Sequence, residues 1–122
     1  MGQVLSIDDP VARLDAFAGF MRNQWVSGAA ALSIQRDALR VDPDAAADVV
    51  AILETRASGL FEVVRPMGRH LKAGLTVQKA HDLLLALTLL EIFLELQARG
   101  WSANAYEEWL AGALRSALLG RL

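Results

Sequence analysis

Residues 83–96 read LLLALTLLEIFLEL, and every position in this run except Thr88, Glu91 and Glu95 is apolar. A helix on the surface of a globular protein needs one apolar stripe, whereas a helix that is apolar nearly all round must be covered on both sides. In a chain of 122 residues the rest of the fold can cover one of these sides. We therefore expect a second copy of the protein to cover the other.

The same run lacks the pattern of a membrane span. A span needs about 20 uninterrupted apolar residues, whereas His81 and Asp82 close one end of this run and Glu91 and Glu95 interrupt the other. We interpret the run as a helix of the core and of an interface, and we expect no membrane association.

The composition favours a single all-α domain. Of the 122 residues, 54% are hydrophobic and only 7% are aromatic, and this balance favours helices over strands. We expect residues 9–122 to form one domain around one core, after an N-terminal tail of residues 1–8. The formal charge of −2 gives no electrostatic case for nucleic-acid binding, and the lack of Cys excludes thiolate chemistry and fits a cytoplasmic protein.

Capping signals divide the first part of this domain. Asp9-Pro10 is typical of a helix start, because an N-cap residue precedes Pro at the first helical position. We expect Ser27-Gly28 to end or bend the helix that begins there.

A second start signal, Asp42-Pro43, opens the helix with the clearest apolar periodicity in the chain. Pro66 removes a backbone hydrogen bond and disfavours helix at Arg65, which predicts a break at that point. Gly74 suits a left-handed helix end.

The last two predicted helices follow without a long linker. Thr76 caps a central helix that we expect to continue to about Arg99, a length of about 36 Å at about 1.5 Å per residue. Gly100 ends that helix, and Ser102 caps the final one.

The C-terminal third resembles the closing helices of TetR/AcrR-type transcriptional regulators. The resemblance is carried by the long apolar helix and by the segment ARGWSANAYEEWLAGALRSALL that follows it. Its most specific part is Gly100-Trp101-Ser102 followed by Tyr106 and Trp109. The resemblance implies a bundle of five to six helices whose last two pair with those of a partner in a four-helix dimer interface.

That family reads DNA through an N-terminal helix-turn-helix of about fifty residues. Residues 1–8 are too short to supply it, and residues 9–40 lack a basic, tight-turned helix pair. The resemblance therefore implies that this chain is the regulatory and dimerisation domain alone. We expect no direct nucleic-acid binding by this chain, and DNA contact only through a missing N-terminal domain.

The resemblance also implies a cavity for a small, largely hydrophobic effector between the first, middle and central helices. Such a pocket has apolar walls and a few polar groups. The candidate wall residues are Phe17, Met21, Trp25, Leu53, Ala57, Phe61 and Met67, and the candidate polar groups are Glu54, Arg56, His81 and Thr88. Each apolar member could equally be part of an ordinary core, and Phe20 could join either set.

The expected dimer seam lies on the last two helices, where small residues would allow close approach. Burying several Leu side chains there would stabilise the pair by roughly 1.5–3 kcal/mol for each. The candidate seam residues are Leu85, Thr88, Ile92, Tyr106, Trp109, Ala113 and Ala117.

Patterns that indicate catalysis are not found. His70 and His81 are the only histidines, and neither has a Glu three residues before it, as di-iron bundles require. There is no Gly-rich phosphate loop and no Gly-x-Ser-x-Gly elbow. We predict a protein that is not an enzyme and has no metal and no cofactor. The alternative to effector sensing is a stand-alone helical interaction protein with a solid core and no small ligand.

Overall fold

The structure is a computed structural model that describes residues 1–38 and 43–120. Within these ranges it does not describe the side chains of residues 29–38, 43–50, 52 and 53. The described part is an all-α bundle, as predicted, and it holds no strand. Its elements are α1 (Gly2–Leu5), α2 (Pro10–Ala38), α3 (Pro43–Val64), the 3-10 helix η1 (Arg65–His70), α4 (Val77–Leu87), α5 (Leu90–Ala98) and α6 (Ala103–Leu118).

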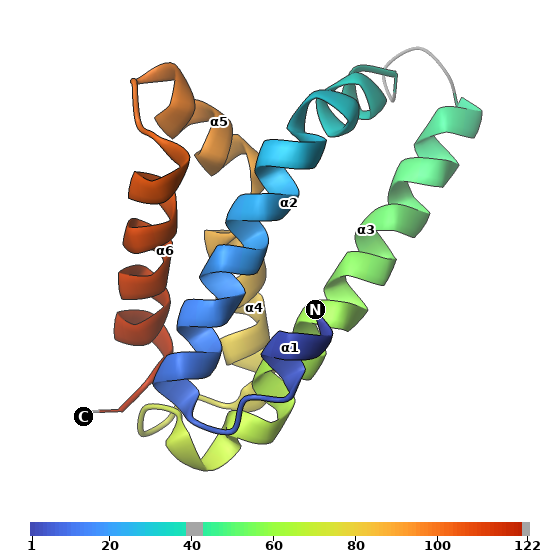
Figure 1. Ribbon diagram of the computed structural model, residues 1–122. Helices are drawn as coiled ribbons and strands as arrows, with labels where there is room; N and C mark the ends of the chain where they lie inside the picture. Colours follow the sequence, from blue (N-terminus) through green and yellow to red (C-terminus); the bar gives the residue numbers. More distant parts are fainter. Residues whose placement is uncertain (39–42, 121–122) are drawn as a thin grey trace.

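Helix α2 is the centre of the bundle. It lies between α6 on one side and the antiparallel α3 on the other, with α4 behind it and α5 crossing near the top (Figure 1). All of these helices contribute to one hydrophobic core. Its fully buried members include Leu14, Phe17, Leu60, Val63, Val64, Met67, Leu84, Tyr106, Leu110, Leu114 and Leu118.

The predicted helix starts are confirmed by their capping hydrogen bonds. The side chains of Asp9, Thr76 and Ser102 each accept a hydrogen bond from the backbone N–H three residues on, at 2.9, 3.1 and 3.1 Å. Gly74 and Gly100 have φ angles of 82° and 91°, the left-handed conformation that favours glycine at helix ends.

Two predictions about α2 and α3 have different outcomes. The break at Arg65-Pro66 is confirmed, because α3 ends at Val64 and η1 follows. Of the end or bend expected at Ser27-Gly28, the end is wrong, because α2 continues to Ala38. A single glycine costs a helix only about 1 kcal/mol relative to Ala. The other predicted start residue, Asp42, lies outside the described residues.

Residues 1–8 pack on the bundle rather than forming a tail outside it. Val4 of α1 is 4% exposed and belongs to the hydrophobic core. Arg13, which is itself 4% exposed, holds this segment in place. Its guanidinium donates to the backbone oxygens of Leu5 and Ile7 at 2.9 and 3.0 Å.

Arg13 also binds the end of α3. It donates to the backbone oxygens of Glu62 and Val63 at 2.9 and 2.8 Å. The last carbonyls of a helix have no partner within the helix, so the guanidinium satisfies groups that would otherwise be buried unpaired. Burial lowers the pKa of Arg13.

The central helix predicted from Thr76 to Arg99 is broken. Helix α4 ends at Leu87 and α5 begins at Leu90, with Leu89 extended at φ −62° and ψ 141°. At this break the hydroxyl of Thr88, the residue after the last one of α4, donates to the backbone oxygen of Leu84 at 2.7 Å. The apolar run 83–96 is thus divided between two short helices.

The division leaves the run only partly enclosed by its own chain. Leu84, Leu90 and Phe93 are buried, while Leu89 is 43% exposed. Of the remaining apolar members, Ala86 is exposed, and the half-buried ones are Leu83, Leu85, Leu87, Ile92, Leu94 and Leu96. Much of this surface remains available to a partner.

Candidate functional site

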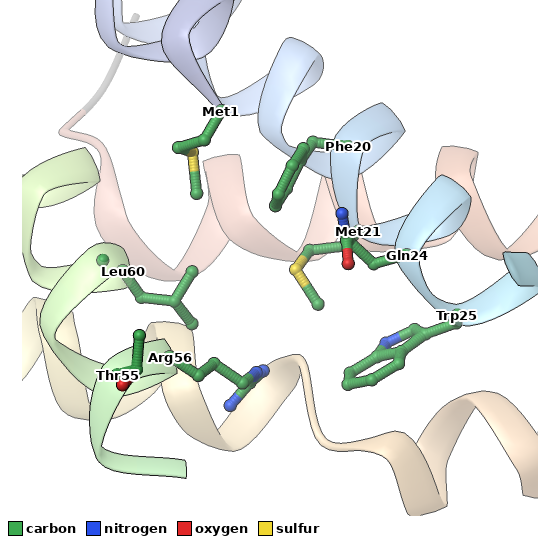
Figure 2. Close-up of a pocket in the computed structure, with 9 residues that line it drawn as sticks. Met1, Phe20, Met21, Gln24, Trp25, Thr55, Arg56 and Leu60 are labelled. Carbon is green, nitrogen blue, oxygen red and sulfur yellow. The ribbon is translucent and has the colours of Figure 1, made fainter. Parts of the chain in front are cut away.

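A pocket of about 340 Å³ lies between α1, α2 and α3 (Figure 2). This volume is at the lower end of the range of about 300–1,000 Å³ that is typical of small-molecule sites. The lining residues are Met1, Phe20, Met21, Gln24, Trp25, Thr55, Arg56, Gly59 and Leu60.

The pocket follows from one spacing that occurs on both long helices. Helix α2 contributes positions 20, 21, 24 and 25, and α3 contributes positions 55, 56, 59 and 60. Neighbours four apart lie on one helical face, so two such faces meet across the gap between the antiparallel helices. Gly59 brings no side chain into this gap, and a Cβ atom at its position would meet nothing within 4 Å.

Arg56 provides the charge in this pocket. Among the described lining residues it is the only charged side chain. Its guanidinium carbon lies 5.5 Å from the ring centroid of Trp25, a cation–π arrangement, and the two side chains point toward each other in Figure 2. The same guanidinium donates from Nη2 to the backbone oxygen of Thr88 at 2.8 Å and to its Oγ1 at 2.5 Å.

Beside Arg56 lie two buried polar atoms. Nε1 of Trp25 and Oη of Tyr106 have no hydrogen-bond partner among the described residues. Trp25 is 5% exposed and Tyr106 is 1% exposed. Burial raises the pKa of Tyr106 to about 12, against the opposing effects of the Trp25 N–H and the charge of Arg56. The indole N–H therefore lies close enough to the phenol oxygen to act on it, although the pair misses strict hydrogen-bond geometry.

The structure brings three of the sequence-predicted ligand residues together in this pocket, namely Met21, Trp25 and Arg56. Two others, Phe17 and Met67, line neither this pocket nor the hollow described next and are enclosed in the hydrophobic core. Both lie on the apolar stripe of a helix, and the stripe alone does not distinguish a core residue from a pocket residue.

A second group of predicted residues lies elsewhere. Ala57, Phe61 and His81 line a shallower surface hollow between α3 and α4. Nε2 of His81 is 2.8 Å from the backbone oxygen of Ala57, and its ring meets Phe61 edge-on at 5.3 Å. Glu54 is exposed and lines neither cavity, and the side chain of Leu53 lies outside the described residues.

Sequence reasoning missed much of the pocket. The predicted ligand residues do not include Gln24, Thr55, Gly59 or Leu60, and Met1 belongs to the predicted N-terminal tail. The paired spacing on the two long helices is the signal that could have found the first four. This spacing indicates a pocket only once α2 and α3 are known to be antiparallel neighbours.

Two of the predicted seam residues are also wrong. Thr88 and Tyr106 are 0% and 1% exposed, so their own chain encloses them and a second subunit cannot reach them. Thr88 is likewise not a ligand residue, since its hydroxyl is engaged by Leu84 and Arg56. The other five candidates, Leu85, Ile92, Trp109, Ala113 and Ala117, are half-buried.

No group of three or more His, Cys, Asp or Glu within the described ranges is arranged to hold a metal ion. No helix in the part of the chain that the structure describes has the length and apolar character needed to cross a membrane. No family model, curated protein or solved structure matches the chain.

Proposed function

We propose that this chain is the effector-sensing and dimerisation domain of a bacterial TetR-like transcriptional regulator. It acts in the cytoplasm as a homodimer, and it senses a small effector rather than catalysing a reaction. In this proposal DNA is read by a helix-turn-helix head that these residues do not supply. The observation that carries the proposal is the pocket between α2 and α3, one wall residue of which also binds the junction of α4 and α5.

The cavity favours sensing over the alternative, an interaction protein with a solid core. Phe20, Met21 and Leu60 give the pocket apolar walls, while Gln24 and Arg56 add a few polar groups. A small number of polar groups in an apolar cavity is typical of ligand sites. Met side chains adapt to ligands of different shape.

Arg56 supports coupling between the pocket and the dimer surface. It lies in the pocket wall and at the same time hydrogen-bonds Thr88, at the break between α4 and α5. A ligand that moves the guanidinium changes the bonds that stabilise this break. Leu85 and Ile92 flank the break on either side and belong to the proposed seam, so occupancy of the pocket alters the seam.

The proposed seam uses the five half-buried candidates on α4, α5 and α6. On α6, Glu107 and Arg115 face α2, where they form ion pairs with Arg22 and Asp15. Trp109, Ala113 and Ala117 recur at every fourth position and so form a separate stripe of this helix. Closed two-fold pairing would bury that stripe together with the exposed part of residues 83–96.

The test uses N-phenyl-1-naphthylamine, a neutral apolar dye whose fluorescence rises in an apolar site. The wild-type protein is compared with Gly59→Leu, whose side chain fills the pocket, and with Gly59→Ala, which adds one methyl group in open space. We expect enhancement with wild type and Gly59→Ala and its loss with Gly59→Leu. Equal enhancement in all three would refute the pocket, and a monomer in light scattering at micromolar concentration would refute the homodimer.

A further inference from the structure

We infer that the pocket between α1, α2 and α3 takes a small, uncharged, fused-ring aromatic molecule, whose rings lie against Phe20 and Met21. This inference rests on the proposed function and adds the chemical class of the ligand. It is carried by the thioether and aromatic groups that gather in the pocket lining, and by the partners that the charged residue of this lining already has.

Two kinds of side chain that attract aromatic rings surround the cavity. Among the described lining residues, Met1 and Met21 contribute thioethers, and Phe20 and Trp25 contribute rings. Figure 2 shows Phe20 and Met21 on the α2 side of the gap, with Leu60 of α3 across from them. Thioether sulfurs and aromatic rings attract a further ring beyond the effect of apolar burial alone. A saturated ligand of the same skeleton gains none of this attraction.

The ring of Phe20 is supported from the core. It is stacked on Phe17, with ring centroids 6.4 Å apart and an angle of 25° between the ring planes. Phe17 is fully buried, whereas Phe20 is half-buried and lines the pocket. A side chain that is ordered before the ligand arrives loses little conformational freedom on binding. Phe20 therefore offers the ligand a preformed aromatic surface.

The opposite wall has no side chain at Gly59. A Cβ atom at this position would meet nothing within 4 Å. Glycine allows a ligand to approach the backbone closely, and a flat ring system needs less depth than a puckered saturated one. The cavity volume of about 340 Å³ is at the lower end of the range for small-molecule sites, so the ring system must be small.

Arg56 argues against a charged ligand. It is the only charged residue of the described lining, and its guanidinium already hydrogen-bonds Thr88 and lies over the ring of Trp25. A cation would be repelled by this guanidinium in surroundings of low dielectric constant. An anion would compete for it with the backbone oxygen of Thr88, and a buried acceptor that loses its donor is costly. An uncharged ligand incurs neither cost.

The test uses four probes at neutral pH: 2-naphthalenemethanol, its fully saturated analogue, 2-naphthoate and 2-naphthylmethylammonium. Binding is measured by titration calorimetry and as the ligand-dependent rise in unfolding temperature. For wild type we expect the aromatic alcohol to bind at least about fivefold more tightly than each of the other three. Apolar burial alone predicts the reverse order for the two alcohols, because the saturated one has the larger apolar surface.

Four variants separate the parts of this inference. Met21→Leu nearly conserves the side-chain volume but removes the sulfur, and Phe20→Leu removes the ring. Each should lower the preference for the aromatic over the saturated alcohol by about twofold or more. The matched control is Met67→Leu, which makes the same change in the hydrophobic core outside the pocket and should leave the preference unchanged. Gly59→Leu should abolish binding of every probe.

The outcomes distinguish the ligand class from the pocket. If the saturated alcohol binds wild type as tightly as the aromatic one, the aromatic assignment is wrong and the pocket stands. The same holds if the preference survives both Met21→Leu and Phe20→Leu, or if Met67→Leu lowers it as much as they do. If either ion binds as tightly as the aromatic alcohol, the ligand is not restricted to uncharged molecules. If no probe binds wild type, or if Gly59→Leu binds them all as wild type does, the proposed function itself fails.

Discussion

Arg56 on α3 donates from a single nitrogen, Nη2, to both the backbone oxygen and the hydroxyl of Thr88, 32 residues further along the chain. The backbone group that it satisfies belongs to the residue at which α4 stops. The bonds from this charged residue thus meet the long apolar run at the point where it divides into α4 and α5. The same residue is in the wall of the pocket, so ligand recognition and the shape of the α4–α5 surface share one side chain.

Replacing Thr88 with Val should destabilise the protein by about 1–3 kcal/mol, because the hydroxyl both donates to Leu84 and accepts from Arg56 in a buried place. The matched control is Thr55→Val. Its hydroxyl donates to the backbone oxygen of Ala51 on an exposed surface, so its loss should change stability by no more than about 0.5 kcal/mol. Urea unfolding followed by circular dichroism measures both changes in the free energy of unfolding. Equal changes would show that the buried hydroxyl at the α4–α5 junction stabilises the protein no more than an exposed one does.

Tyr106 should make the protein less stable in strong alkali. Its pKa is raised from the ordinary value of 10.0 to about 12 in the folded state. Below pH 10 the phenol is neutral in both states, but between pH 10 and 12 only the unfolded state ionises. The free energy of unfolding should therefore fall across this window by roughly 2–3 kcal/mol.

Tyr106→Phe provides the control for this alkaline loss. The variant should lack that part of the decline between pH 10 and 12, because it has no phenol to ionise. Since Tyr106 is the only tyrosine in the chain, its phenolate absorbance reports the titration directly. A midpoint near pH 10 in the folded protein would contradict the prediction.

Arg13→Met should cost about 3 kcal/mol or more, because it leaves backbone oxygens of α3 and of the segment after α1 without their donor. Arg99→Met is the comparison. Arg99 is exposed and forms a surface ion pair with Glu95 at 2.8 Å, a type of contact worth about 0–1 kcal/mol. Thermal unfolding of the two variants tests the difference, and similar midpoints would argue against a structural role for Arg13.

Two glycines should respond to alanine in opposite directions. Gly28 lies within α2 and its Cβ position is open, so Gly28→Ala should raise the free energy of unfolding by about 0.5–1 kcal/mol. Gly74 has a φ angle of 82°, so Gly74→Ala should lower it by about 1–2 kcal/mol. Chemical denaturation distinguishes them, and a stabilising Gly74→Ala would be inconsistent with the left-handed turn.

The proposed seam predicts a position-dependent effect on assembly. Ala117→Arg places a charge on the stripe proposed to meet the partner and should shift the protein from dimer to monomer in light scattering. Ser116→Arg changes the adjacent exposed residue and should leave the dimer intact. If neither variant alters the mass, the stripe is not the interface.

The local chemistry of helix ends was predictable from the sequence. Asp9, Thr76 and Ser102 cap helices where expected, and Pro66 ends α3. These signals act within a few residues, so the sequence around them contains all that is needed. The failure at Ser27-Gly28 has the same origin, because a weak local stop does not end a helix whose remaining residues favour it.

The candidate site was less predictable, because it depends on which helical faces meet. Met21 and Trp25 were identified as pocket residues, but Phe17, one turn earlier on the same stripe, is closed core. The stripe is the same in both cases, and only the position of α3 relative to α2 decides where packing ends and the cavity begins.

By itself, the sequence determined the all-α class, the helix starts and the excess of apolar surface in residues 83–96, since composition, caps and periodicity are properties of the chain. Only the tertiary structure decided that this run breaks at Thr88, that Tyr106 is enclosed and that Arg13 binds backbone oxygens on two other segments. Each of these depends on a partner distant in sequence, which no local pattern specifies.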